Sequence, residues 1–183
     1  VAGCHRMMRR ADREVTDCEQ IEGIVAACRI VHVGYADAEG LTIVPLNFGY
    51  EWQQDGDAGT GDELAGLTLY IHSASIGRKL DAIRAAGNAL DVAFSMETDC
   101  EVIAGRTPCN WGEAFKSIVG NGTASIIDNL DEARQGLALL MRQQAGMEHV
   151  EFTDQQVRAV TVWKVEADYF TAKVREKPQP HMH

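Results

Sequence analysis

Alternating apolar and polar positions dominate the middle of this 183-residue chain. Runs with a period of two, rich in β-branched residues, lie at 29–35, 41–52, 67–72, 89–96, 113–127 and 160–165. Helical spacing of apolar residues occurs at 16–28, 75–87, 131–145 and 153–159. About six strands with three or four helices and short links predict a mainly β fold with peripheral helices. Such links favour an antiparallel barrel over a parallel, doubly wound sheet.

Turn and cap residues refine this pattern. The sequence Asp37-Ala-Glu-Gly40 has turn chemistry, so the strands on either side of it are expected to form a hairpin. Thr16 and Glu19 have the spacing of a capping box and predict the start of a helix. Pro45 lies inside the strand predicted at 41–52 and cannot donate to a ladder, which indicates an edge, a bulge or a gap in the sheet.

Two glycines, Gly120 and Gly122, lie inside the strand predicted at 113–127. Glycine within a strand marks a sharp bend or a close approach of backbone to something else. The two residues therefore predict either a barrel bend or a ligand contact. The segment between Gln53 and Gly66 is rich in Gly and Asp and is the best candidate for a mobile loop.

The segment 70–83 contains the strongest functional signal, because its period changes there from strand to helix. Small residues occupy the change, and two adjacent cations, Arg78 and Lys79, follow in the first helical turn. The dipole already makes a helix N-terminus positive, so cations there favour an anion. Free amides, hydroxyls and a bidentate guanidinium together suit a phosphate group. The alternative is that Arg78 pairs with Asp81 or Asp62 while Lys79 is solvated.

Composition limits the classes of partner. The length fits one domain, predicted at residues 8–175 with flexible termini at 1–7 and 176–183, and 45% hydrophobic residues suffice for a core. A formal net charge of −10 without a long basic stripe argues against nucleic acid as a partner. No apolar run approaches membrane-spanning length, and no signal peptide is visible. The five cysteines lack zinc-ligand spacing, so we expect no metal site and a cytoplasmic protein.

Several segments, taken in order, resemble one known family. They are Arg9 to Asp17, Val44-Pro-Leu-Asn-Phe-Gly-Tyr50, Tyr70-Ile-His-Ser-Ala74 with Gly77-Arg-Lys-Leu-Asp81, Phe115-Lys-Ser-Ile-Val-Gly-Asn-Gly-Thr-Ala124 and Thr161-Val-Trp-Lys-Val165. In this order they are similar to the nitroimidazole-resistance (Nim) proteins of the pyridoxamine 5′-phosphate oxidase-like, FMN-binding split-barrel superfamily. The resemblance covers roughly residues 8–175.

The resemblance implies a split β-barrel that forms a homodimer, with flavin (FMN) at the interface and a small molecule as substrate. It implies that the strand-to-helix turn holds the FMN phosphate. Phe115 stands where the family more often has Tyr, so any role of that hydroxyl is lost. The residues that it selects for the cofactor are Pro45, Leu46, Asn47, His72, Ser73, Ala74, Arg78, Lys79 and Ser117.

By resemblance, the leading hypothesis is an FMN-dependent oxidoreductase that reduces small, electron-poor compounds such as 5-nitroimidazoles. His72 would donate a proton or hold the substrate, or would only line the pocket. One alternative is a split barrel that binds haem or flavin without fast turnover. Another is oxidation of a pyridoxamine-type amine, which needs a second phosphate site, and the only other basic cluster is the arm Arg9, Arg10 and Arg13. Trp111 is the tryptophan best suited to cover a ligand.

Overall fold

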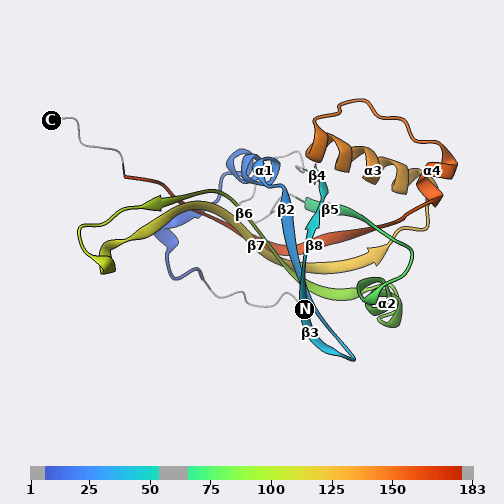
Figure 1. Ribbon diagram of the computed structural model, residues 1–183, viewed down its shortest axis with the longest axis horizontal. Coiled ribbons are helices and arrows are strands. Elements are labelled where there is room, and N and C mark those ends of the chain that lie inside the picture. The colour runs from blue at the N-terminus through green and yellow to red at the C-terminus, as the bar shows by residue number, and fades with distance from the viewer. Residues whose placement is uncertain (1–6, 54–65, 179–183) are drawn as a thin grey trace, which may run out of the picture.

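The computed structural model describes residues 7–53 and 66–178. Most of the predicted flexible termini, and the Gly- and Asp-rich segment with Asp62, lie outside the described residues. Strands dominate the described part, as the residue pattern predicts (Figure 1). The strands are β1 (Glu14–Val15), β2 (Ile30–Asp37), β3 (Gly40–Asn47), β4 (Gly49–Gln53), β5 (Gly66–Ser73), β6 (Leu90–Ile103), β7 (Gly112–Ile126) and β8 (Thr161–Arg175).

One antiparallel sheet contains all of these strands. Its order is β3-β2-β6-β7-β8-β5-β4, and the short β1 pairs with β8. The strands β3 and β4 end this path on opposite sides, although the single residue Phe48 separates them in the chain. The two edges of the sheet must therefore approach each other at Phe48, which is fully buried. This is a barrel that is curled but not closed by hydrogen bonds, so the prediction of an antiparallel split barrel is confirmed.

The segment 41–52 is thus two strands rather than the one that the sequence predicts. Up to Asn47 the chain pairs with β2, and from Gly49 it pairs with β5. Pro45 lies in an edge strand of the sheet, so its missing N–H interrupts no ladder on the open side. The predicted turn also forms, with Asp37 opposite Gly40.

The glycines of β7 mark a bend and not a ligand contact. The register between β7 and β8 shifts between Asn121 and Gly122. A Cβ atom on Gly122 would lie 2.2 Å from the Glu166 carbonyl oxygen, so the neighbouring strand itself occupies that space. Of the two predictions made for this pair, the barrel bend is therefore correct.

Helices cover the ends and one side of the sheet. They are α1 (Cys18–Ala27), α2 (Arg78–Ala85), α3 (Leu130–Ala145) and α4 (Asp154–Arg158). Asp17, rather than Thr16, caps α1 by accepting a bond from the Gln20 amide. Thr153 begins α4 with a complete capping box. The apolar sides of α1 and α2 enter the main core, and α3 and α4 enclose a smaller one around Leu137 and Val157.

The ladder between β6 and β7 is longer than the sequence predicts. The predicted strands end at 96 and begin again at 113, but β6 continues to Ile103 beyond a bulge and pairs with β7 down to Gly112. The result is a projecting arm, closed by a short 3-10 turn at Pro108–Asn110 (Figure 1). Within the described part of the chain, no helix is long and apolar enough to cross a membrane.

Candidate functional site

The turn from β5 to α2 supplies a helix N-terminus without a side-chain cap. Gly77 precedes the helix with φ 136°, a conformation that residues with a side chain rarely adopt. Its carbonyl accepts from the amides of Leu80 and Asp81, and no side chain caps the turn. The amides of Arg78 and Lys79 precede the first intrahelical bonds and are therefore free to meet a ligand. Ile76, expected on the helix's apolar face, lies before the helix and is 81% exposed.

Ser73 connects this turn to the core. Its side chain is buried, and its Oγ accepts a hydrogen bond from Trp163 Nε1 at 3.0 Å. The hydroxyl can still donate its own hydrogen. The neighbouring His72 and Ala74 are exposed. Because His72 and Ser73 face opposite sides of β5, only His72 presents its side chain to solvent.

The cation Arg78 is already engaged. Its Nε and Nη2 atoms each donate to the Asp37 carboxylate at 2.7 Å, and Nη2 also donates to the Gly40 carbonyl at 3.2 Å. The hydrogen bond from Arg78 lowers the pKa of Asp37 below its ordinary value. The predicted alternative for Arg78 was an ion pair with Asp81 or Asp62, yet the partner is Asp37 in the turn between β2 and β3.

Lys79, unlike Arg78, is not engaged in an ion pair with another described residue. Among the described residues it has no hydrogen-bonding or ion-pair partner, and its side chain is half-buried. An ammonium group beside free helix amides is a favourable place for a phosphate. The residues present at this turn therefore fit the phosphate of a flavin nucleotide.

The residues expected to line the flavin ring occupy the other side of the split. Pro45 is exposed on β3, whereas Leu46 packs against the core. The Asn47 side chain donates to Gln144 Oε1 at 3.0 Å, at the end of α3. The three side chains thus do not face one common surface.

Strand pairing places these residues across from the β5–α2 turn. The ladder between β4 and β5 ends at Gly49 opposite Tyr70. Beyond it the chain turns away into β3, so Asn47 and Pro45 diverge from His72. The split in the sheet is therefore flanked by β3 on one side and by the end of β5 with α2 on the other.

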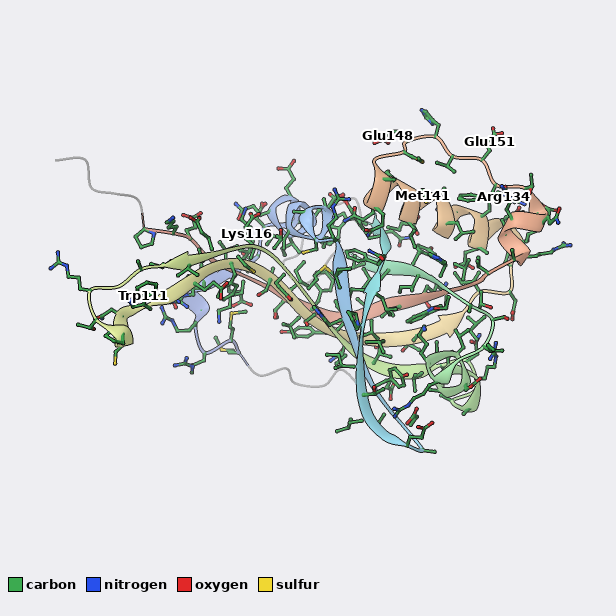
Figure 2. The ribbon with its side chains drawn as sticks, in the orientation of Figure 1. Trp111, Lys116, Arg134, Met141, Glu148 and Glu151 are labelled. Atoms are coloured by element: carbon green, nitrogen blue, oxygen red, sulfur yellow. The ribbon has the colours of Figure 1, made fainter. Side chains whose placement is uncertain are left out.

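Ser117 and Trp111 lie elsewhere in the same chain. Ser117 is on β7, opposite Glu97 and Lys173, and other strands separate it from both β3 and β5. Trp111 is at the end of the projecting arm, remote from α2 (Figures 1 and 2). Within one chain, neither residue meets the β5–α2 turn.

Two concavities of the described surface are also separate from the predicted residues. One of about 640 Å³ lies between the end of α2 and α4, lined by residues such as Asn88 and Arg158. One of about 830 Å³ lies between the N-terminal segment and β8, lined by residues such as Arg13 and Arg175. Neither is lined by a residue predicted to bind the cofactor.

Sequence reasoning missed two residues of this region, Asp37 and Trp163. Asp37 signalled only a turn, and its partner Arg78 is 41 positions away. Trp163 is 90 positions from Ser73. Neither separation leaves a local pattern, so only the folded chain reveals these contacts.

The described residues thus form an antiparallel split barrel with an uncapped, cation-bearing helix start. Residues 17–174 match the pyridoxamine 5′-phosphate oxidase family, and the chain belongs to that family. No curated protein sequence matches the chain.

Several solved structures are similar to this chain. The chain is similar to a candidate 5-nitroimidazole antibiotic resistance protein from Bacteroides thetaiotaomicron VPI-5482, with 29% identity, a TM-score of 0.67, and 88% of this chain and 86% of that one covered. The flavocytochrome Anf3 from Azotobacter vinelandii has 19% identity, a TM-score of 0.69 and coverages of 94% and 74%. The FAD and haem binding protein from Mycobacterium smegmatis has 18% identity, a TM-score of 0.68 and coverages of 92% and 76%. The last two share the fold.

Proposed function

We propose that the protein is an FMN-dependent oxidoreductase that reduces small, electron-poor compounds such as 5-nitroimidazoles. The observation that carries this proposal is the β5–α2 turn, where free helix amides and the unpartnered Lys79 suit a phosphate. Family membership and the similarity to a candidate nitroimidazole-resistance protein support a flavin and this substrate class.

The chain's own groups would bind and orient the cofactor and substrate. Lys79 and the first amides of α2 would hold the phosphate, and the Ser73 hydroxyl, which accepts from Trp163, would anchor the turn to the core. Pro45 offers an exposed, rigid surface for the ring, while Leu46 and Asn47 support the strand behind it. When bound, a flavin supplies the electrons for reduction of an electron-poor compound.

His72 is the residue proposed to act on the substrate. It is exposed at the end of β5, and among the described residues its imidazole has no hydrogen-bonding partner. An imidazole can carry a donatable proton on a ring nitrogen, so it suits proton donation to a reduced product. Its second possible role is to hold the substrate by a hydrogen bond.

A homodimer is part of the proposal. Within one chain Ser117 is remote from the β5–α2 turn, so its predicted approach to the cofactor requires a second copy.

The first experiment is an FMN titration of the purified protein, followed by assay of nitroimidazole consumption with reduced FMN. We expect tight binding, consumption of the nitro compound, and loss of turnover but retention of FMN in His72→Gln. Binding without consumption would leave the cofactor assignment and remove the reductase. Failure to bind FMN would contradict the proposal as a whole.

A second candidate is a cofactor-binding protein without fast turnover, holding haem or flavin. The exposed, unpartnered His72 favours it, because a neutral imidazole is a common axial ligand of haem iron. The visible spectrum of protein incubated with haem separates the two candidates. A Soret band that is lost in His72→Ala would support haem binding.

A further inference from the structure

The ion pair between Arg78 and Asp37 connects two segments that are far apart in the sequence. Both bonds to the carboxylate are 2.7 Å long and come from different guanidinium nitrogens, which is the bidentate arrangement. The third bond, to the Gly40 carbonyl, holds the other end of the same turn. The guanidinium thus holds the β2–β3 turn through Nε and Nη2, while no bond of Nη1 is among those of the described residues.

The Asp37 carboxylate is also held by more than one partner. The Asp37 side chain is only 12% exposed, and it also accepts from the Glu39 amide at 2.9 Å. Since Asp37 is supported within its own turn, its orientation does not depend on Arg78 alone. A phosphate that took the place of Asp37 would have to replace the two 2.7 Å bonds from Nε and Nη2.

The position of this ion pair in the barrel gives it a consequence for the site. The split between β3 and the β5–α2 turn is closed at one end by the chain itself, at Phe48. At the other end, the turn before β3 meets the start of α2 only through Arg78 with Asp37 and Gly40, among the hydrogen bonds of the described residues. The spacing between Pro45 on β3 and Lys79 on α2 is therefore fixed by this contact.

We propose that Arg78 is a positioning residue, which with Asp37 sets the width of the split, while Lys79 and not Arg78 supplies the cation for phosphate. This inference rests on the proposed flavin site and changes the role expected of Arg78. If this is correct, loss of the Arg78 side chain displaces both α2 and β3, and β3 is the strand that would face the flavin ring.

Flavins with and without a phosphate distinguish the two roles. We would titrate FMN and riboflavin into the wild type, Lys79→Ala, Arg78→Ala, Asp37→Asn and the double variant Asp37→Asn/Arg78→Ala. Lys79→Ala should weaken FMN binding about tenfold or more and leave riboflavin binding unchanged. Arg78→Ala and Asp37→Asn should weaken both flavins by similar factors, and the double variant should be no worse than either.

A direct contact between Arg78 and the phosphate would give a different pattern of flavin binding. If Arg78 is a phosphate ligand, Arg78→Ala will weaken FMN alone, and Asp37→Asn will leave FMN binding unchanged or tighten it by freeing the guanidinium. Either result would overturn the inference while the FMN site stands. A wild type that binds neither flavin would overturn the inference together with the proposed function.

An exchanged pair provides a check against simple misfolding. The variant Asp37→Arg/Arg78→Asp keeps the ion pair but removes the cation from α2. With a positioning role, it should recover flavin affinity and the visible circular dichroism of the bound flavin relative to Arg78→Ala. Recovery of thermal stability without recovery of either flavin signal would overturn the inference.

Discussion

Ser73 shows how one buried hydroxyl serves both the core and the candidate site. Its Oγ is the acceptor for Trp163 Nε1, and both side chains are buried. Ser73→Ala would leave a buried indole N–H without an acceptor, so we expect a loss of about 1–3 kcal/mol in the free energy of unfolding. Denaturant titration followed by Trp fluorescence measures this. Ser75→Ala, in the same turn but exposed, should change little, and equal losses would contradict the account.

Gly77 and Gly23 offer opposite effects from the same substitution. Gly77 has φ 136°, so Gly77→Ala should destabilise by about 1 kcal/mol or more, although nothing blocks the added methyl group. Gly23 lies inside α1 without a positive φ and also has open space, so Gly23→Ala should stabilise by roughly 0.5–1 kcal/mol. Thermal unfolding of the two variants tests the sign. A neutral Gly77→Ala would contradict the strain argument.

Cys28 should be the least reactive of the described cysteines. Burial raises the pKa of its thiol to about 12, whereas Cys100 and Cys109 are exposed. Below its unfolded pKa near 9 the thiol is neutral in both states; as pH rises from there towards 12, only the unfolded state ionises, so stability falls. Alkylation read by peptide mass spectrometry should label Cys100 and Cys109 in the native protein and Cys28 only after unfolding. Equal labelling would contradict its burial.

At the scale of elements, α3 is held against the sheet by close backbone contact. A Cβ atom on Gly49 would lie 2.3 Å from the Leu140 backbone nitrogen. The backbone of β4 or α3 could move away only by breaking its own hydrogen bonds. Gly49→Ala should therefore lower the free energy of unfolding by about 1–3 kcal/mol or more. Gly66→Ala, on the adjacent strand, would place its Cβ atom 3.4 Å from Gln53 Cβ and 3.9 Å from the nearest backbone atom, so it is the matched control. Urea unfolding should separate the two variants, and similar midpoints would refute this packing.

How far the sequence predicts these elements depends on how local their causes are. The helix predicted at 153–159 and the turn at Asp37–Gly40 depend on neighbouring residues, and both form. The break at Phe48 has no local signal, because the alternation continues through it and only the choice of partner strand changes. The extension of β6 to Ile103 likewise depends on pairing with β7.

The features of the candidate site also differ in how local their causes are. The uncapped helix start and its cations follow from a short stretch of sequence around Gly77, and the helix forms there. The role of Arg78 does not, since its partner Asp37 belongs to another hairpin. Chain topology brings β3 and the end of β5 to the two sides of the split, and this follows only from strand pairing.

At the scale of the whole molecule, the sheet exposes several large apolar side chains to water. Leu41 and Ile43 on β3 are 89% and 64% exposed, and Val119 on β7 is 56% exposed. Strand register places Gly34 opposite Ile43 and Ala93 opposite Gly34. These small residues leave a flat surface between the larger ones, which suits contact with a second copy.

This face is where the predicted homodimer can be tested. Ile43→Asp would place a charge among these exposed apolar side chains, so we expect the dimer to dissociate while the fold persists. Light scattering gives the mass, and circular dichroism the fold; Met147→Asp, exposed beyond α3, is the control. If the flavin lies at the interface, FMN affinity should fall together with the dimer. A monomeric wild type, or a dimeric Ile43→Asp, would exclude this face, whereas a monomeric variant that retains FMN would place the cofactor within one chain.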